Sequence, residues 1–266
     1  MSVAYMNGLT TEMNEQKMMS TGISKLDELL GGGIQRGFTM AISSIPGTNI
    51  EIIIKQIASI DQPVYVTTNE TKDEVISTMN EFSWDSSNIE FIDIAQKNLE
   101  HILDGENKRV SIHQQRSKNL IKELIQAGSQ GLPPSKLGET DYLAILSQVL
   151  REQSSKKIIV NSLDFFFEQY NADDVLRTLK AGKVNIFQNN GVLFFTFTRG
   201  IHDTVIERQI ELLADSVIDL DVVKKGSSLE RILSVMKMRN IGKRIGTARY
   251  DIDEKGFTLE EIERIL

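Results

Sequence analysis

The chain alternates short apolar runs with amphipathic stretches, and this alternation is the feature that most constrains its fold. The apolar runs are often β-branched and predict strands buried on both faces of a sheet; they are Phe38–Ser43, Pro63–Thr67, Ile89–Ile94, Lys157–Asn161 and Gly191–Phe197. Between them, apolar residues recur at helical spacing, as in Ile50–Ile57 and Tyr142–Leu150. Strands that alternate with helices predict an α/β fold with a mostly parallel sheet covered on both faces.

The C-terminal part follows a different pattern. From Asp215 onward, strand-like runs succeed one another without helices between them, which predicts an antiparallel β extension along one edge of the sheet. The stretch Asp104–Thr140 is the least regular, with one short amphipathic helix at Leu120–Ile125 before the loop GLPPSKLG. Loops this long are usually functional or mobile. We expect residues 1–17 to form an N-terminal arm and residues 18–266 to form a single domain.

Net charge, cysteine content and hydropathy exclude several classes of function. The chain carries a formal net charge of −7 and no cysteine, which excludes disulfides, thiolate zinc sites and cysteine nucleophiles. His101, His113 and His202 lack the spacing of metal ligands, so no metal site is predicted. A duplex-binding protein usually carries a basic face, so the acidic balance argues against a nucleic-acid partner. No apolar run approaches the roughly 20 residues of a membrane span, and the polar N-terminus lacks a secretory signal, so we expect a cytoplasmic location without membrane contact.

Residues Ser44–Ile54 read SIPGTNIEIII and occupy the position of a phosphate-binding loop. Such a loop reads G-x-x-x-x-G-K-[ST], follows a strand and opens a helix. A strand and a helix are both predicted on either side of this stretch, but the lysine and both framing glycines are missing. The stretch therefore has the setting of a nucleotide-binding loop without its phosphate-contacting residues.

A second stretch connects this loop with a known family. Ser20–Gly33 reads STGISKLDELLGGG and resembles the segment before the phosphate loop in KaiC-like ATPases, a branch of the RecA-like P-loop superfamily. Later runs are similar to the family's second strand (VYVTTNET), its Walker B strand (KIIVNSL) and its C-terminal strands (ADSVIDLDVV and VMKMRN). The resemblance covers residues 18 to 258, nearly the whole chain. It implies a RecA-like three-layer α/β/α fold, ATP and Mg²⁺ as cofactors, and assembly with neighbouring subunits.

The resemblance also assigns the family's catalytic positions to residues of this chain. The loop's proline, glycine and threonine are retained as Pro46, Gly47 and Thr48. Other positions are changed: the two framing glycines fall on Ser44 and Asn49, the lysine on Ile50, the magnesium-binding threonine on Glu51, the Walker B aspartate on Asn161, and the two adjacent glutamates on Asn69 and Glu70.

Each change removes a chemical role. The lysine stabilises the charge of the β- and γ-phosphates, which Ile50 cannot do. Asn161 lacks the carboxylate charge that favours a metal shell, and Asn69 cannot accept a proton as a base. Asp164 follows Asn161 by roughly 10 Å of extended chain, too far to replace it without a bend. We therefore expect that ATP hydrolysis is lost and that no cofactor binds. In the alternative, the divergent residues still bind nucleotide, and ATP and Mg²⁺ are the cofactors.

The spacing of Thr48 and Glu51 matches a T-x-x-E capping box. A helix N-terminus presents free N–H groups and the positive end of its dipole to phosphate. If Glu51 supplies the anion and Thr48 the acceptor, the loop is plugged by the chain's own carboxylate. The alternative is that Glu51 is an ordinary first-turn glutamate that points to water.

Other residues are candidates for contacts with a partner. Lys237 and Arg239 alternate, so both point to one face of a strand; the resemblance implies that the matching pair reaches a neighbour's nucleotide, and the alternative is protection of an edge strand from aggregation. Phe165, Phe166, Phe167 and Tyr170 follow the end of a central strand, where open α/β sheets bind ligands, although residues in such positions more often pack under the next helix. Arg199 and His202 lie in a loop that the superfamily directs toward the ring centre or DNA, and they are its candidate anion binders.

Three functions compete. The first is a non-catalytic KaiC/RecA-like protein that acts by protein–protein or peptide binding, as a ring subunit or as a regulator of a related ATPase. The second is an ATP-binding KaiC-like ATPase with divergent motifs, and the third is a DNA-recombination accessory. The changed catalytic positions favour the first over the second, and the acidic balance favours it over the third. The expected partner is a protein or peptide, either a second copy of the chain or a KaiC-like paralogue.

Overall fold

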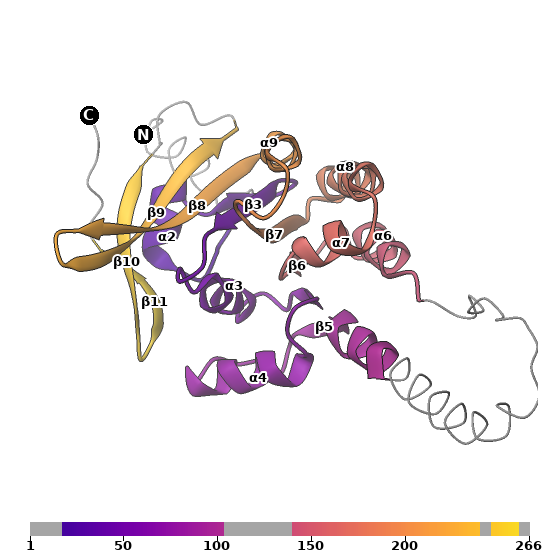
Figure 1. Ribbon diagram of the computed structural model, residues 1–266, viewed down its shortest axis with the longest axis horizontal. Coiled ribbons are helices and arrows are strands. Elements are labelled where there is room, and N and C mark those ends of the chain that lie inside the picture. Colours follow the sequence, from indigo (N-terminus) through magenta and orange to yellow (C-terminus); the bar gives the residue numbers. More distant parts are fainter. Residues whose placement is uncertain (1–17, 104–139, 240–245, 261–266) are drawn as a thin grey trace, which may run out of the picture.

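The computed structural model describes residues 18–103, 140–239 and 246–260. The predicted N-terminal arm and nearly all of the irregular stretch after Asp104 lie outside the described residues. The main sheet has nine strands in the order β11-β10-β9-β8-β3-β7-β6-β4-β5 (Figure 1). Its strands are β3 (Thr39–Ser44), β4 (Val64–Thr67), β5 (Glu90–Asp93), β6 (Lys157–Val160), β7 (Val192–Thr198), β8 (Ser216–Lys225), β9 (Ser228–Met238), β10 (Thr247–Asp253) and β11 (Gly256–Leu259).

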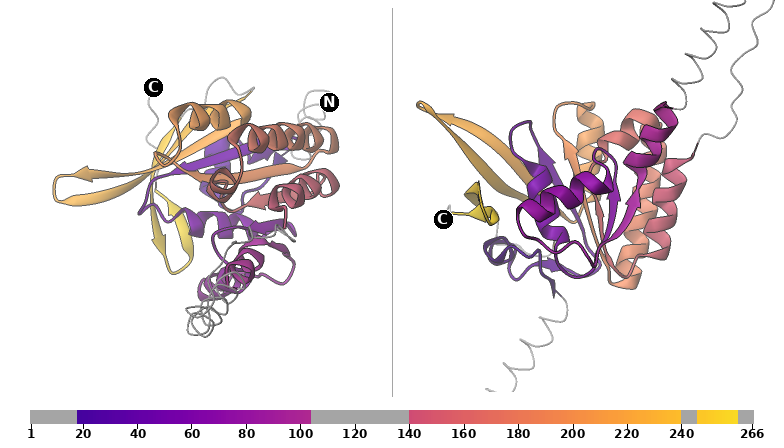
Figure 2. Two further views of the ribbon diagram at one scale, coloured as in Figure 1. Left: turned by 45° about the vertical axis from the view of Figure 1, so that its right-hand side comes forward. Right: turned by 90° about the horizontal axis from the view of Figure 1, so that it is seen from below.

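The sheet is parallel from β8 to β5 and antiparallel from β8 to β11. Strand β3 is an inner strand of the parallel part, because it pairs in parallel with both β7 and β8. The antiparallel strands β9, β10 and β11 follow β8 along one edge, and the long β8–β9 hairpin projects beyond the body of the domain (Figure 2). The strands predicted from apolar runs and the antiparallel extension are confirmed, and the strand boundaries shift by at most one residue.

Helices cover both faces of the sheet and give it two hydrophobic cores. One core packs α2 (Ser24–Leu30), α3 (Ile50–Ala58) and α4 (Lys72–Glu81) together with the C-terminal strands. The other packs α6 (Tyr142–Glu152), α7 (Asp164–Gln169), α8 (Ala172–Asn189) and α9 (Thr204–Leu213). The predicted three-layer α/β/α, RecA-like fold is therefore confirmed. Helix α4 begins with the capping box that Thr71 and Glu74 predict.

The segment Ser20–Gly33, which resembles the KaiC-like family, contains α2 and connects two short strands. Hydrogen bonds between its own residues fix its first turn. The Asp27 carboxylate accepts hydrogen bonds from the Thr21 N–H at 2.8 Å and the Thr21 hydroxyl at 2.7 Å. The glycines that end the motif let the short strands β1 (Met18–Met19) and β2 (Ile34–Gln35) pair closely. At Gly33, where φ is +113°, a Cβ would lie 2.4 Å from the Met19 carbonyl oxygen. A larger residue there would force β1 and β2 apart.

A buried lysine ties this segment to the sheet. Lys157 opens β6, and its ammonium donates to the carbonyls of Ser20 at 3.2 Å and Ile57 at 3.3 Å and pairs with Asp61 at 2.9 Å. Burial lowers the pKa of Lys157, and the Asp61 carboxylate opposes that shift. The apolar strand pattern had predicted the strand but not this polar contact at its start.

No helix of the described residues is long and apolar enough to span a bilayer.

Candidate nucleotide-loop site

The connection between β3 and α3 keeps the path of a phosphate loop. Asn49 adopts the left-handed conformation, with φ 56°, which glycine favours and asparagine tolerates. Gly47 has φ +92°. Within the part of the chain that the structure describes, the N–H groups of Gly47, Thr48 and Asn49 make no backbone hydrogen bond. At the second framing position, Asn49 therefore makes the left-handed turn that glycine favours.

The predicted Thr48–Glu51 capping box is wrong. The N-cap of α3 is Asn49, and it caps the helix with no side-chain hydrogen bond. The Thr48 hydroxyl donates to the Ile45 carbonyl at 2.8 Å, and the Glu51 carboxylate accepts from the Asn49 side-chain amide at 3.2 Å. Because the left-handed turn at Asn49 starts the helix one residue later than the motif assumes, Thr48 and Glu51 do not have the N-cap and N3 positions. Glu51 therefore forms no capping box with Thr48 at the start of α3.

Two residues of the C-terminal strands hold the loop by its carbonyls. The Tyr250 hydroxyl on β10 donates to the Thr48 carbonyl at 2.8 Å. The Arg231 guanidinium on β9 donates to the Gly47 carbonyl at 3.3 Å. Burial raises the pKa of Tyr250, so the phenol remains a hydrogen-bond donor well above neutral pH. Sequence reasoning missed both contacts, since neither residue belongs to a recognisable motif.

Asn161 uses its side-chain oxygen to join two strands. It follows β6, and its oxygen accepts from the Thr68 N–H at 2.8 Å and the Thr68 hydroxyl at 2.6 Å. An oxygen occupied by two donors is a poor support for a metal shell. The residue is thus a structural link between the ends of β4 and β6.

Tyr65 on β4 belongs to the same site, because its hydroxyl interacts with Asn161, Glu70 and Glu51. Its hydroxyl is fully buried and has no hydrogen-bond partner among the described residues. Burial raises the pKa of Tyr65 well above its usual range, and the negative charges of Glu70 and Glu51 raise it further. The Asn161 side chain opposes these effects, although it makes no hydrogen bond of ordinary geometry with the hydroxyl.

Glu70, the surviving glutamate, forms an ion pair inside the domain. The Lys55 ammonium on α3 lies 2.6 Å from the Glu70 carboxylate and 3.1 Å from the Thr78 hydroxyl. The Lys55 side chain is 1% exposed and that of Glu70 is 28% exposed. Sequence reasoning missed Lys55, because it lies outside the apolar stripe of Ile50–Ile57 and reads as an ordinary charged residue. Asn69, at the position of the base, is exposed.

Lys237 and Arg239 both contact the turn between α9 and β8. The Lys237 ammonium donates to the carbonyls of Glu211 at 3.0 Å, Leu212 at 3.1 Å and Ala214 at 2.7 Å. Arg239 pairs with Asp215 at 3.0 Å. Lys237 therefore stabilises the C-terminal end of α9, while a role in a neighbour's nucleotide site stays a prediction.

The contacts of Lys237 predict a measurable loss of stability when its charge is removed. We expect Lys237→Met to lower the free energy of unfolding by about 1–2 kcal/mol, because three carbonyls at a helix C-terminus lose a cationic donor. Urea denaturation measures the change, and Lys224→Met, at an exposed position near the hairpin tip, is the matched control. Equal stability of the two variants would leave Lys237 free for a role in another subunit.

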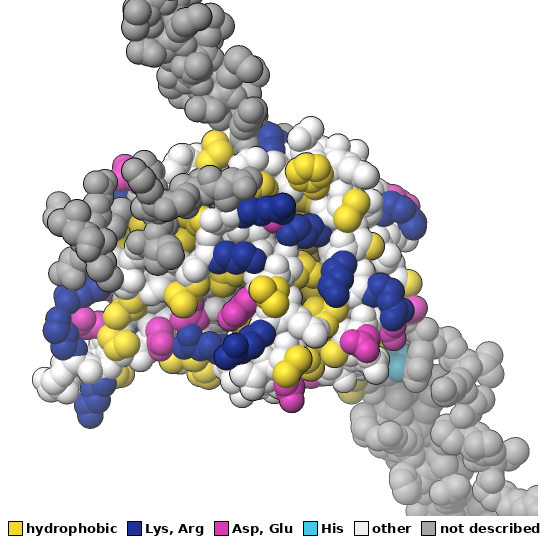
Figure 3. All heavy atoms as spheres, turned by 90° about the horizontal axis from the view of Figure 1, so that it is seen from above, with side chains coloured by type: hydrophobic (Ala, Val, Ile, Leu, Met, Phe, Trp, Pro, Cys, Tyr) yellow, Lys and Arg dark blue, Asp and Glu magenta, His cyan; other side chains and the backbone are white. Residues whose placement is uncertain are grey.

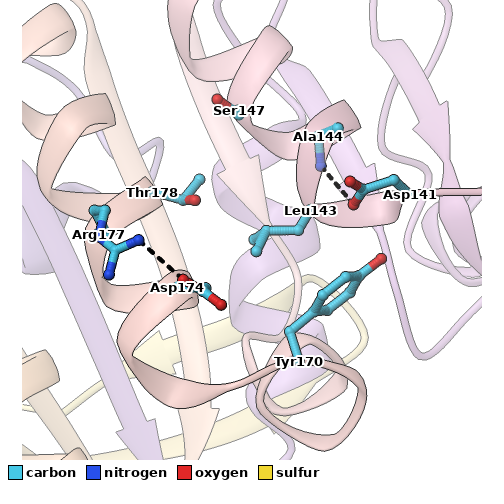
Figure 4. Close-up of a pocket in the computed structure, with 8 residues that line it drawn as sticks. All are labelled: Asp141, Leu143, Ala144, Ser147, Tyr170, Asp174, Arg177 and Thr178. Carbon is cyan, nitrogen blue, oxygen red and sulfur yellow. Dashed lines mark hydrogen bonds and ion pairs between the residues drawn. The ribbon is translucent and has the colours of Figure 1, made fainter.

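The aromatic group after β6 divides between core and surface. Phe165 and Phe166 are buried in the second core, and Phe167 packs against the His202 ring with centroids 5.2 Å apart. The Tyr170 hydroxyl accepts from the Tyr142 N–H at 2.7 Å. Of the four predicted groove residues, Tyr170 lines an open pocket of 370 Å³ between α6 and α8 (Figure 4).

That pocket has the character of a polar surface recess. Arg177 pairs with Asp174 at 3.0 Å, and the Asp141 carboxylate accepts from the Ala144 N–H at 3.0 Å (Figure 4). Both carboxylates on its rim are thus already bonded within the chain. The recess also lies in the helix layer opposite to α3, so it is separate from the phosphate-loop path.

Arg199 and His202, the candidate anion binders, have acidic partners within the domain. The Arg199 guanidinium pairs with Asp219 and, at 2.9 Å, with Asp221. The His202 ring lies 2.8 Å from the Asp164 carboxylate, which also accepts from the Thr198 N–H at 3.1 Å. These pairs fix the loop after β7 against the ends of β6 and β8. Asp164 therefore anchors this loop and does not replace Asn161.

The sheet order, the helices on both faces and the phosphate-loop path between β3 and α3 define a RecA-like P-loop domain. The chain belongs to the KaiC family of ATPases: the family model described as "ATPase: KaiC" matches residues 19–264.

Individual relatives agree with this assignment. A UPF0273 protein of Pyrococcus furiosus is 24% identical over 252 residues, which cover 90% of this chain and 92% of the relative. The circadian clock oscillator protein KaiC of Rippkaea orientalis is 21% identical over 94% of this chain, and the match spans 44% of that protein. The crystal structure of a KaiC-like protein from Pyrococcus horikoshii has a TM-score of 0.64 at 18% identity, with coverage of 92% of this chain and 99% of that one.

ATP and Mg²⁺, which the family implies, do not fit the residues present. The helix begins with Ile50 and Glu51 where the loop needs a cation and a hydroxyl. The Asn161 oxygen is occupied by Thr68, and Glu70 is neutralised by Lys55.

Proposed function

We propose that the chain is a non-catalytic member of the KaiC family, a pseudo-ATPase that acts by binding another protein or peptide. The proposal rests on one observation: the residues at the family's catalytic positions, taken together, lack the groups that ATP and Mg²⁺ need. Ile50 and Glu51 replace the lysine and the hydroxyl, and the polar groups that remain at Asn161 and Glu70 are bonded within the domain. A site with these groups has neither a free cation for the phosphates nor a carboxylate for the metal.

The partner in this proposal is a second copy of the chain or a KaiC-like paralogue, which the chain would join as a subunit or regulator. The retained fold supports a protein partner, because the outer surfaces of the domain stay available for binding when the nucleotide-contacting groups are lost. A DNA-recombination role has less support, since Arg199 and His202 are paired with acidic residues. The proposal includes a cytoplasmic location.

Calorimetry with ATP·Mg²⁺ tests the loss of nucleotide binding. We expect no binding tighter than about 1 mM and no hydrolysis by the chain alone. The loop backbone keeps its route, so Ile50→Lys with Glu51→Thr and Asn161→Asp is the informative comparison: this variant should recover weak binding, because it restores the cation, the hydroxyl and the carboxylate. Micromolar binding by the unmodified chain would support the second function, a divergent ATPase, and overturn the proposal.

A further inference from the structure

Exposed apolar side chains concentrate on two neighbouring helices. Of the ten large hydrophobic residues that are exposed in the described part of the chain, four lie on α8 and α9. They are Val184 at 53% exposure, Phe187 at 67%, Val205 at 62% and Leu212 at 75%. Single exposed hydrophobic residues are normal on protein surfaces, but a concentration on adjacent elements marks an interaction site.

Three of these side chains lie at the same ends of the two helices. The Lys183 ammonium on α8 reaches the Leu213 carbonyl at the end of α9, at 2.6 Å. Val184 and Phe187 therefore flank the point where α8 meets the last turn of α9, which carries Leu212. Figure 3 looks onto this side of the molecule, where hydrophobic side chains are interspersed with many Lys and Arg side chains and with several Asp and Glu side chains. We call Lys180, Val184, Phe187, Arg208 and Leu212 the α8–α9 face.

The charge of this face is opposite to that of the whole chain. Lys180 lies one helical turn before Val184, and Arg208 lies one turn before Leu212, so each cation borders an apolar residue on its own helix. Both cations are exposed and form no ion pair with a described residue. Arg239, 60% exposed, lies close by through its pair with Asp215, to which Lys183 also binds. A chain with net charge −7 thus presents a local basic rim around apolar side chains.

We propose that the α8–α9 face binds an amphipathic helix of a partner protein whose apolar stripe is flanked by Asp and Glu. This proposal rests on the proposed protein-binding function and adds the place of binding and the chemistry of the partner. A helix that lays an apolar face across two others is a recurrent mode of recognition, and an exposed phenylalanine is a suitable anchor. The rim cations select acidic flanks and exclude basic ones. Nucleic acid would use the cations but would leave Phe187 and Leu212 without apolar contacts.

Two synthetic helical peptides test the proposal by fluorescence anisotropy with the full chain. Both carry leucines at i, i+3, i+4 and i+7; one has Glu at the flanking positions and the other has Lys. We expect the acidic peptide to bind at least about tenfold more tightly than the basic one, and Phe187→Ser or Leu212→Ser to weaken the acidic peptide by about tenfold, as the loss of an interface anchor does. Leu229→Ser is the matched control, because Leu229 is 72% exposed on β9, outside the α8–α9 face, and should leave the affinity within about twofold.

Several results would overturn this inference. Equal binding of both peptides, unchanged affinity in the Phe187 and Leu212 variants, or an equal loss in the Leu229 control would each place the contact elsewhere. Displacement of the acidic peptide by duplex DNA at the same charge concentration would indicate a nucleic-acid face instead. Circular dichroism confirms that the variants fold. Nucleotide calorimetry remains independent of these outcomes, so a failure of the α8–α9 face is distinguishable from a failure of the pseudo-ATPase proposal.

Discussion

Asp215→Asn should lower the free energy of unfolding by about 3–5 kcal/mol, the cost of breaking a buried ion pair by removing one partner. The Asp215 side chain is 2% exposed and pairs with Lys183 at 2.7 Å and Arg239 at 3.0 Å. Its second oxygen accepts from the N–H and the hydroxyl of Thr39, both at 3.1 Å. One carboxylate therefore joins β3, the start of β8, α8 and the end of β9. The amide of asparagine cannot replace the charge for both cations.

The stabilisation by Asp215 should depend on pH in a defined direction. Burial by itself raises the pKa of this carboxyl, but Lys183, the Thr39 N–H and Arg239 together outweigh burial and lower it below 3.8. Because the unfolded state binds the proton first as the pH falls, the contribution is complete above the unfolded pKa and is lost as the pH falls through the folded pKa. The difference between the natural chain and Asp215→Asn should therefore shrink in acid.

Urea denaturation at neutral pH and in acid measures both effects. Asp174→Asn is the control, since the Asp174–Arg177 pair is exposed on both sides and such pairs contribute at most about 1 kcal/mol. If Asp215→Asn were no more destabilising than Asp174→Asn, the network at the start of β3 and β8 would not hold the sheet together.

Glu70→Ala should cost about 3 kcal/mol, because it leaves the buried Lys55 ammonium without its counter-charge. The value lies at the lower end of the range for buried pairs, since the Glu70 side chain is 28% exposed and water can partly replace it. Lys55→Met combined with Glu70→Leu should recover most of the loss, because no charge then remains buried. A catalytic glutamate kept for chemistry would behave in the opposite way, and its removal would leave stability unchanged or higher.

A double-mutant cycle on Lys55 and Glu70 separates these possibilities. Glu168→Ala, which removes an exposed glutamate from α7, controls for the general effect of losing a carboxylate. Additive losses in the cycle would mean that the two side chains do not stabilise each other, and the interpretation of Glu70 as a structural partner would be wrong.

Local patterns predicted the architecture well, because strand and helix identity depends on neighbouring residues. The capping box at Thr71 and Glu74 formed as its spacing indicates. The same motif at Thr48 and Glu51 did not form, because the left-handed turn at Asn49 moved the helix start. The spacing of Thr and Glu does not reveal a left-handed residue between them, and Asn49, unlike glycine, gives little sign of one in the sequence.

The polar contacts of the site were outside the reach of sequence patterns. Lys55 and Glu70 are 15 residues apart, and Thr48 and Tyr250 are 202 residues apart. Only the fold brings these groups together, since β10 and α3 meet through tertiary packing. Burial was also invisible in the sequence: Lys55 and Lys157 read as ordinary charged residues, yet their side chains are 1% and 0% exposed.

The bond between Tyr250 and Thr48 has a consequence for where the chain can be shortened. The C-terminal hairpin of β10 and β11 also lies on α3, because the Phe257 N–H donates to the Gln56 side chain at 2.8 Å. Gly256 fits against Trp84 so closely that a Cβ would lie 2.2 Å from the indole ring. The last two strands thus act as an external brace on the loop and its helix. A fragment that ends after β9 keeps every residue of the P-loop motif but loses the brace that fixes the motif's shape.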